Sequence, residues 1–238
     1  YPNSLRAWIL IVFNCSVRDN FSSFFCSISC TKRLWDSANL LRDAPPLLYV
    51  KGRVDLLNYP ICISIVGARN ASIASRKIAS KISFDLTNND ILVISGMARG
   101  IDSAAHKGAL YAKNQSGPTV AVLGTGADGV YPIENQELYE QICSSGAIVS
   151  EYPLGTLPQS SNFPRRNRLV SALSSAILVV EASSNSGSLI TARLGLEQGK
   201  DIFVIPGNIY SKTSDGTNFM ISEGAIPVTS YKDILKME

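Results

Sequence analysis

Short apolar runs alternate with amphipathic stretches along most of the chain, from residue 61 to residue 205. The apolar runs are rich in β-branched residues and have the length of strands; they lie at 61–66, 91–94, 119–123, 147–149, 176–180 and 202–205. Strands that are apolar without interruption are covered on both faces, as in parallel sheets. Helix-like segments separate them at about 74–87, 101–112, 134–145, 166–174 and 188–198. The pattern predicts an α/β fold with a doubly wound, mostly parallel sheet and helices on both faces.

The first 42 residues do not share this pattern. From Ala7 to about Leu41 the sequence is rich in Ser, Cys, Phe and Asn without a clean period, which fits an irregular layer, an insertion or a disordered stretch. An ordered pattern begins at Asp43, and residues 47–50 are expected to form a short edge strand. We therefore divide the chain into an irregular N-terminal segment, 1–42, and one domain, 43–238.

Glycines follow four of the predicted strands, at Gly67, Gly96, Gly124 and, after a proline, Gly207. Glycine lets the chain turn sharply and lets a ligand approach the backbone. In open parallel sheets the carboxyl ends of the strands form the ligand crevice. We therefore expect the functional site along this edge of the sheet, lined by the loops that follow the strands.

Three loops combine a glycine with a predicted helix start, where free backbone N–H groups suit a phosphate. They are Gly67-Ala-Arg69-Asn70, Ser95-Gly96-Met97-Ala98-Arg99-Gly100 and Ser186-Gly187-Ser188. Taken singly, each is more often a plain strand-to-helix turn with a capping serine. Three such turns on one edge, two of them with an arginine, favour an anionic ligand that carries several phosphates.

The most informative segment is Ser161-Asn-Phe163-Pro-Arg165-Arg166-Asn167-Arg168. An aromatic face stacks on a base and guanidinium groups pair with phosphates whatever the base sequence, which is the chemistry of a single-stranded nucleic acid site. Residues 161–200 carry five Lys/Arg and two Glu, a local charge of +3 (5 − 2). Alone, the segment also fits a solvated basic helix start with Phe163 in the core. Together with the three loops it favours nucleic acid.

Composition adds little to this hypothesis. The whole chain has a net charge of only +3, so global charge does not indicate a nucleic-acid-binding protein. Its five cysteines, at 15, 26, 30, 62 and 143, form no CxxC pair and no metal-ligand spacing with the single histidine, which favours free thiols in a reducing cytoplasm. No apolar run approaches the roughly 20 residues that span a bilayer.

Catalysis and cofactor binding have weak support. The run Gly124-Thr-Gly126-Ala-Asp-Gly129 matches the dinucleotide fingerprint GxGxxG, which requires a helix that begins within the glycines. A proline at 132 disfavours helix before it, so the next helix is expected only near Glu134. Asp102 and His106 are four residues apart on one helix face, where a helix-surface pair is more common than an acid/base dyad. We expect no enzyme activity, no metal and no cofactor.

Nine ordered blocks between about residue 43 and residue 230 resemble the DNA-processing protein A family (DprA, also called Smf). The blocks are Ile65-Val-Gly-Ala-Arg-Asn70, Ser95-Gly-Met-Ala-Arg-Gly-Ile-Asp102, Ala105-His-Lys-Gly-Ala109, Ala121-Val-Leu-Gly124, Tyr131-Pro-Ile-Glu-Asn135, Ser150-Glu-Tyr-Pro153, Phe163-Pro-Arg-Arg-Asn-Arg168, Ser186-Gly-Ser-Leu-Ile-Thr-Ala-Arg193 and Val204-Ile-Pro-Gly207. The resemblance implies a Rossmann-like protein that binds single-stranded DNA, protects incoming DNA and loads the RecA recombinase onto it during natural transformation. It also implies a bacterial, cytoplasmic homodimer that uses no cofactor and catalyses no reaction.

The resemblance further implies roles for individual residues. Arg69 would hold a phosphate in the strand-end pocket, Phe163 would lie in a loop against the DNA, and Arg166 and Arg168 would support that loop. The residues Ser186, Gly187 and Ser188 would supply backbone and hydroxyl donors. The expected DNA-binding set is Arg69, Ser95, Gly96, Arg99, Phe163, Arg166, Asn167, Arg168, Ser186, Gly187 and Ser188.

The chain departs from the family pattern at two positions. Ser161-Asn162 stands where members often carry Gly-His or Gly-Ser, and Asn185 stands where a basic residue is frequent; both changes are expected to weaken DNA affinity. The main alternative is a nucleotide-processing, phosphoribohydrolase-like enzyme on a similar fold. Such enzymes place a catalytic glutamate soon after a glycine-rich turn, whereas Glu197 lies nearly three turns beyond Ser188.

Overall fold

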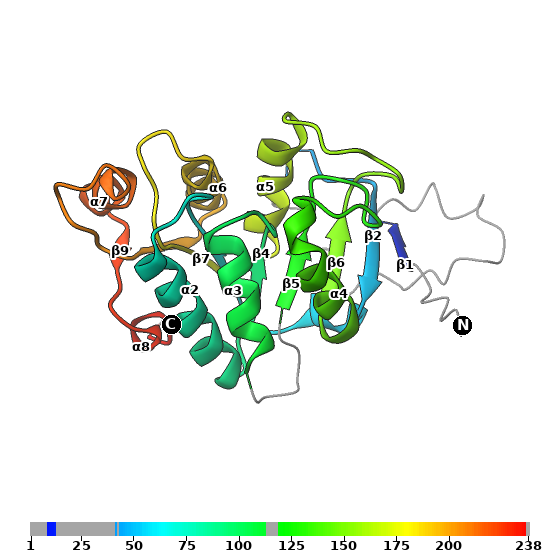
Figure 1. Cartoon of the computed structure of the whole chain (residues 1–238), viewed down its shortest axis with the longest axis horizontal. Coiled ribbons are helices and arrows are strands. Elements are labelled where there is room, and N and C mark those ends of the chain that lie inside the picture. The colour runs from blue at the N-terminus through cyan, green and yellow to red at the C-terminus, as the bar shows by residue number, and fades with distance from the viewer. Residues whose placement is uncertain (1–8, 13–40, 42, 113–118, 237–238) are drawn as a thin grey trace.

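The computed structural model describes residues 9–12, 41, 43–112 and 119–236. Their strands form one nine-stranded sheet in the order β1-β2-β6-β5-β4-β3-β7-β8-β9 (Figure 1). From β6 to β9 all neighbours pair in parallel, whereas β2 is antiparallel to both β6 and β1. The strands are β1 (Ile9–Val12), β2 (Leu47–Gly52), β3 (Cys62–Val66), β4 (Leu92–Ser95), β5 (Thr119–Val122), β6 (Ala147–Ser150), β7 (Ala176–Val179), β8 (Asp201–Val204) and β9 (Ile226–Pro227). The predicted mostly parallel sheet is confirmed.

The order of the strands reverses between β3 and β7. From β3 the chain adds β4, β5 and β6 on one side, and then returns to add β7, β8 and β9 on the other side. The strands β3 and β7 are neighbours, with Ser64 opposite Ile177. In doubly wound sheets ligands bind at the carboxyl ends of the strands that flank such a switch point.

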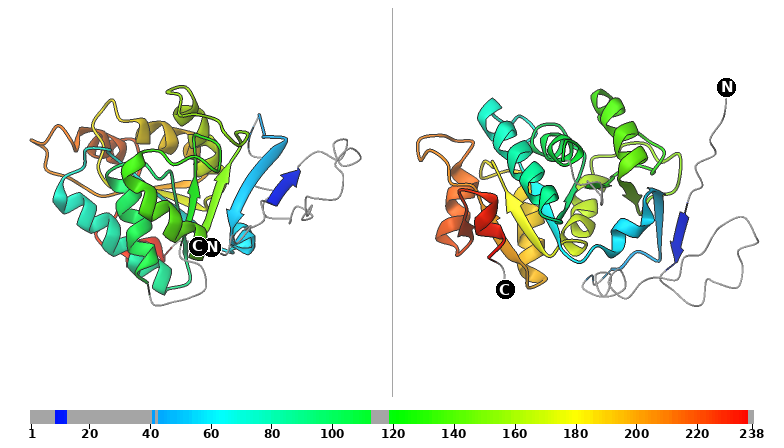
Figure 2. Two further views of the ribbon diagram at one scale, coloured as in Figure 1. Left: turned by 45° about the vertical axis from the view of Figure 1, so that its right-hand side comes forward. Right: turned by 90° about the horizontal axis from the view of Figure 1, so that it is seen from below.

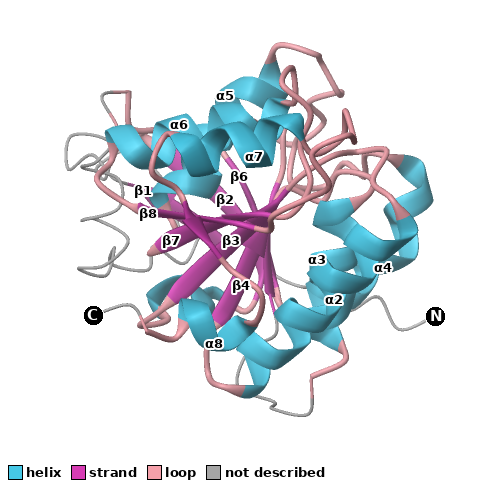
Figure 3. Cartoon of the chain, turned by 90° about the vertical axis from the view of Figure 1, so that its left-hand side faces the viewer, coloured by secondary structure: helices cyan, strands magenta, loops and turns pink. Residues whose placement is uncertain are grey.

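Helices cover both faces of the sheet, as Figure 3 shows. One face carries α2 (Ile73–Asn88), α3 (Ile101–Leu110), α4 (Gln136–Ser145) and α8 (Tyr231–Ile234), and the other carries α5 (Asn162–Ala172), α6 (Gly187–Glu197) and α7 (Asp215–Ser222). Two 3-10 turns, η2 (Val54–Asn58) and η3 (Ile133–Asn135), lie in connections. None of the described helices is both long and apolar enough to cross a bilayer.

Strand β3 illustrates how the sheet divides the core into two layers. Ile63 and Ile65 are fully buried in the cluster that contains the apolar residues of α2 and α3. Val66 belongs to the cluster on the opposite face, with Val170 of α5. On that face the Ser64 hydroxyl donates a hydrogen bond to the Val170 carbonyl oxygen at 3.0 Å. The alternation of side chains along a strand thus buries both faces, and loss of the Ile65 side chain would cost about 2–5 kcal/mol.

At one end of the sheet, Ile9–Val12 form β1 within the segment 1–42, for which the sequence predicts no regular element. Because β1 pairs with β2, the strand at 47–52 exists as expected but does not form the edge. Figure 2 shows β1 and β2 far from α7 and α8. Of residues 1–42, all but 9–12 and Leu41 lie outside the described part of the chain, and so do the cysteines at 15, 26 and 30. Cys62 and Cys143 are buried thiols.

Helix α5 begins at Asn162, four residues earlier than the sequence predicts. Pro164 is compatible with this start, because the N–H groups of the first helical turn have no intrahelical partner. Phe163 therefore lies in the first turn of a helix rather than in a loop, and the expectation of a loop at this residue is wrong.

Candidate nucleic-acid interface

A crevice of about 620 Å³ opens at the switch point, above the carboxyl ends of β3 and β7. Its walls come from the loop after β3, the first turns of α5, and the start of α6. Segments that are distant in the sequence thus meet around one cavity; among its lining residues are Arg69, Asp102, Tyr131, Phe163, Arg166, Asn167, Ser186, Gly187 and Ser188. Most of the sequence-predicted site residues therefore share one cavity.

An aromatic and cationic surface forms one wall of this crevice. The guanidinium carbon of Arg69 lies 5.4 Å from the centroid of the Phe163 ring. The Tyr131 ring lies 5.3 Å from the Phe163 ring between centroids, and the two planes are tilted by 32°. The absence of a side chain at Gly124 leaves room for the Phe163 ring, because a Cβ at Gly124 would lie 2.9 Å from Phe163 Cδ1. We call Tyr131, Phe163 and Arg69 the stacking surface.

Tyr131 is a site residue that the sequence reasoning misses. The sequence analysis places Tyr131 before Pro132 and in one of the nine blocks but gives it no role, yet its side chain is 42% exposed and lies against Phe163. The available signal is its place in the long loop after β5, on the same sheet edge as the other candidate loops. Aromatic residues in such a loop are suited to stacking on bases.

Arg166 is buried and fastens α5 to the ends of β4 and β5. Its Nη1 donates to the Gly96 carbonyl oxygen at 2.6 Å and also to the Val122 carbonyl oxygen. Its Nε donates to Asn167 Oδ1 at 3.2 Å. Burial lowers the pKa of Arg166, although the neighbouring Asp102 opposes this effect, and the guanidinium stays charged. Arg166 therefore holds the first turns of α5 in place against the ends of β4 and β5.

Arg168 is also buried and lies in an ion pair. Its Nη2 donates to Glu151 Oε2, and both side chains are only 8% exposed. Asp43 adds a second carboxylate, with Oδ2 3.3 Å from Arg168 Nε. Burial raises the pKa of Glu151, and Arg168 counteracts that effect. Arg168 thus ties α5 to the end of β6, and Arg165 is the exposed arginine of this run.

Among the other predicted residues, Ser95 has a role in the sheet, whereas Ser186, Gly187 and Ser188 form the start of α6 at the crevice. Ser95 is buried, and its hydroxyl donates to the Ile65 carbonyl oxygen at 2.6 Å, so it ties β4 to β3. Ser186 caps α6 by accepting a hydrogen bond from the Ser188 N–H at 3.4 Å. Asn167 donates to the Gly187 carbonyl oxygen at 3.3 Å. The α6 start and α5 are thereby held together at the crevice.

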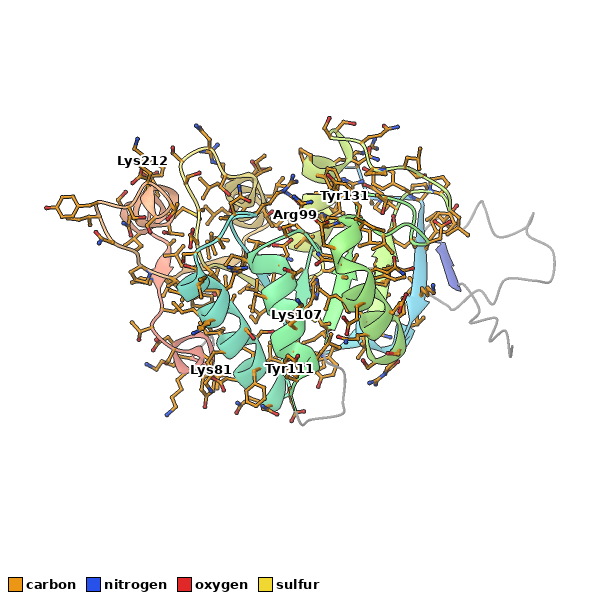
Figure 4. All side chains as sticks on the ribbon, viewed as in Figure 1. Lys81, Arg99, Lys107, Tyr111, Tyr131 and Lys212 are labelled. Atoms are coloured by element: carbon orange, nitrogen blue, oxygen red, sulfur yellow. The ribbon has the colours of Figure 1, made fainter. Side chains whose placement is uncertain are left out.

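A second, shallower groove of about 450 Å³ continues from Arg69 to Arg76 and Arg99. Arg99 forms an ion pair with Glu134, and both side chains are more than half exposed. Figure 4 places Arg99 near Tyr131 at the end of the molecule where the strands finish, whereas Lys81 and Tyr111 lie at the opposite end. The basic surface therefore extends beyond the crevice.

Asp102 and His106 do not form a surface pair, and that expectation is wrong. Both side chains are buried, because the helix face that they share packs on the sheet. Asp102 Oδ2 accepts hydrogen bonds from the backbone N–H groups of Gly96 and Ala98, at 3.2 and 3.3 Å. Burial raises the pKa of Asp102, against the lowering effect of the nearby Arg166. Asp102 therefore shapes the loop after β4.

His106 is a neutral structural group. Its Nδ1 lies 2.7 Å from Thr119 Oγ1, and the Thr119 hydroxyl donates to the Val93 carbonyl oxygen at 2.7 Å. Since the Thr119 proton is used in that bond, Nδ1 carries the imidazole proton and donates it to Thr119. Burial, with a further contribution from Arg166, lowers the pKa of His106 to about 3.

The GxGxxG run at 124–129 does not begin a helix. After β5 the next helical turn is η3, which starts at Ile133, and α4 follows at Gln136. The helix N-terminus that the fingerprint needs is thus displaced from the glycines. Within the described part of the chain, no group of three or more His, Cys, Asp or Glu side chains is placed to hold a metal ion.

Comparison with known proteins agrees with this geometry. The protein DprA of Streptococcus pneumoniae is 42% identical over 201 residues, which cover 84% of this chain and 69% of that protein. Its solved structure matches with a TM-score of 0.81 at 41% identity, over 92% of this chain and 75% of that one. The protein Smf of Escherichia coli is 40% identical over 195 residues, 82% of this chain and 51% of that protein.

A third relative has been studied for its DNA binding. The structure of DNA processing protein A from Helicobacter pylori, which describes its single-stranded DNA binding mode, matches with a TM-score of 0.77 at 31% identity. The match covers 84% of this chain and 89% of that one. The sheet and its helices are therefore Rossmann-like, as in these structures. The family model described as DNA recombination-mediator protein A matches residues 31–238, and the chain belongs to that family.

Proposed function

We propose that residues 43–238 form a DNA-binding domain that holds single-stranded DNA in the crevice at the β3/β7 switch point. The observation that carries the proposal is the stacking surface, in which Arg69 and Tyr131 flank Phe163 at 5.4 and 5.3 Å. Bases stack on such π faces whatever their identity, while a guanidinium attracts the phosphates between them. The domain boundary follows the start of the regular pattern at Asp43.

In this proposal the phosphates meet Arg69 and the start of α6. The backbone at Gly187 and the hydroxyls of Ser186 and Ser188 lie at the N-terminus of that helix, where an anion is favoured. The chain would continue over Arg69 into the shallower groove near Arg76 and Arg99. Because the proposed contacts are to phosphates and to the faces of the bases, we expect little dependence on base sequence.

We further propose that the protein protects incoming DNA and loads RecA onto it during natural transformation, as a cytoplasmic homodimer. These roles rest on membership of a recombination-mediator family. The chain spans 69% of the length of the S. pneumoniae relative and 51% of that of the E. coli relative. These roles are therefore proposed for the whole protein and not for the crevice alone.

We propose a binding protein rather than an enzyme. The phosphoribohydrolase-like alternative needs an acid close to the glycine-rich turn. Glu197 lies at the opposite end of α6 from Gly187, about 15 Å along an 11-residue helix. A turnover assay with nucleoside monophosphates should give no product above a buffer control. Base release that disappears in Glu197→Gln would favour the hydrolase instead.

Fluorescence anisotropy with labelled oligonucleotides tests the binding proposal. The protein should bind single-stranded DNA more tightly than duplex of the same sequence, because the crevice presents ring faces on which the unpaired bases of a single strand can stack. The affinity for both should fall with added salt, since phosphate contacts release counterions. Equal or tighter binding to the duplex would contradict the proposal.

A further inference from the structure

Glu181 lies just after β7 and holds both ends of the loop that carries Arg69. Its backbone carbonyl oxygen accepts a hydrogen bond from the Ala68 N–H at 2.7 Å. Its carboxylate accepts one from the Ser72 N–H at 3.1 Å and one from the Ser72 hydroxyl at 2.9 Å, both at Oε2. One residue on the other side of the switch point therefore fixes positions 68 and 72, with Arg69 between them.

The Glu181 carboxylate is buried and accepts hydrogen bonds from the start of α2 and from Thr213. Glu181 is only 4% exposed. Burial acts to raise its pKa, but hydrogen bonds from Ser75, Ser72 and Thr213 outweigh burial and hold the pKa below its ordinary value. It also lies at the N-terminus of α2, where Ser72 is the cap and a negative charge is favoured. The anion position that this helix offers is thus filled by the protein itself.

The loop has little room to move between its two anchors. The Ala68 carbonyl oxygen accepts a hydrogen bond from the Ile101 N–H at 3.2 Å. Gly100 has a φ of +78°, and a Cβ there would lie 2.2 Å from the Ala68 oxygen and 2.5 Å from the Arg69 oxygen. Arg69 itself is exposed and rests over the Phe163 ring. The place of its guanidinium therefore depends on how the ends of the loop are held.

We propose that Glu181 is a positioning residue for single-stranded DNA: it fixes the 68–72 loop so that Arg69 meets the DNA. The inference rests on the proposed function above. The expected effect of Glu181 on DNA affinity is opposite to that of its charge, because an acidic side chain within the site strengthens the binding of a polyanion. If Glu181 acted only through its charge, its removal would tighten binding.

The test compares Glu181→Ala with Glu181→Gln by anisotropy on single-stranded DNA at several salt concentrations. Glutamine keeps a side-chain oxygen that can accept a hydrogen bond from Ser72, whereas alanine removes both carboxylate oxygens and leaves only the backbone acceptor for the Ala68 N–H. We expect alanine to weaken binding by roughly tenfold and to make the salt slope shallower by about one ion, as loss of one phosphate contact does. Glutamine should stay within about twofold of wild type, which corresponds to about 0.4 kcal/mol. Combining Glu181→Ala with Arg69→Ala should add no further loss.

Alanine binding as tightly as wild type, or losses that add in the double variant, would overturn the proposal. Should Glu181→Ala fail to fold, Ser72→Ala and Ser72→Thr make the same test with every charge in place. Alanine at position 72 removes the hydroxyl that donates a hydrogen bond to Glu181, and it should weaken DNA binding. Threonine keeps a hydroxyl at this position, and it should leave DNA binding unchanged. Equal binding by these two variants would also overturn it.

Hydrogen exchange separates this proposal from the proposed function. The amides of residues 67–72 should exchange faster in Glu181→Ala than in Glu181→Gln or wild type, with no DNA present. Wild-type protein that fails to bind single-stranded DNA would refute the proposed function, whatever the exchange result. Unchanged exchange in the alanine variant would refute the anchoring, whatever the DNA result.

Discussion

The Arg166 guanidinium occupies the space that a side chain on Gly96 would need. The two residues are also joined by the 2.6 Å hydrogen bond from Arg166 Nη1 to the Gly96 carbonyl oxygen, and a Cβ on Gly96 would lie 2.5–2.7 Å from three guanidinium atoms. The buried arginine in α5 therefore requires a glycine at position 96, directly after β4. The loop after β4 and the first turns of α5 can only change together.

Gly96→Ala should therefore destabilise the fold. The methyl group would displace a buried, charged guanidinium from its carbonyl acceptors, and a hydrogen bond to a charged group contributes about 1.5–3 kcal/mol. We expect thermal or urea unfolding to show a loss of at least about 2 kcal/mol. Gly187→Ala is the matched control, because nothing lies within 4 Å of a Cβ at Gly187. Similar unfolding midpoints for the two variants would show that the Arg166 contact is dispensable.

Phe163→Ala should weaken binding to single-stranded DNA by about 1–3 kcal/mol, the contribution of one stacked base. The salt slope should stay nearly unchanged, since no charge is lost. Because Phe163 is half-buried at the crevice, its removal should cost less stability than Leu169→Ala in the same helix, where the leucine is 2% exposed. An unfolding midpoint as low as that of Leu169→Ala would identify Phe163 as a core residue instead.

Arg69→Ala should weaken binding and make the dependence of affinity on salt shallower by about one ion, because a phosphate contact is removed. Arg193→Ala removes an exposed arginine of α6 that does not line the crevice, so its salt slope should match that of wild type. Titrations at four or more salt concentrations measure the slopes. Equal slopes for both variants would place the phosphate contact elsewhere.

His106 should make folding less favourable as the pH falls. Its pKa in the fold is about 3, against an ordinary 6.5, so the unfolded chain binds a proton that the folded chain does not. The stabilisation is complete above about pH 6.5 and is lost as the pH falls towards 3, by at most about 1.4 kcal/mol per pH unit.

His106→Asn should remove this part of the pH dependence, since an amide N–H can replace the donor to Thr119 without titrating. Urea unfolding of both proteins at pH 7, 6, 5 and 4 gives the comparison. Parallel stability curves for wild type and variant across this range would mean that His106 titrates normally in the fold.

The sheet was open to prediction because each buried strand is a short, uninterrupted apolar run that ends at a turn. The start of α5 was not, since Pro164 and the arginines that follow it resemble a loop as much as a helical turn. The spacing of Asp102 and His106 defines a shared helix face but not whether that face meets the solvent or the sheet. Only the packing of α3 on the sheet decides that.

The candidate loops were predictable from glycines and arginines at strand ends, but their mutual contacts were not. Glu181 holds Ser72 across 109 residues of sequence, and Tyr131 meets Phe163 from a different loop. Neither relation leaves a local pattern. In the same way, the sequence does not show that Arg166 and Arg168 point into the protein while Arg69 points out of it.

The most direct test of the central claim is photocrosslinking of the protein to single-stranded DNA that carries 5-iododeoxyuridine, followed by mass spectrometry of the linked peptides. This base reacts with aromatic side chains that it stacks on, so it reports the place of a base rather than an affinity. We predict that the crosslinks fall on Phe163 or Tyr131, and that Arg69→Ala reduces their yield. Crosslinks confined to residues outside the crevice, with the yield unaffected by Arg69→Ala, would contradict the assignment of the switch-point crevice as the DNA site.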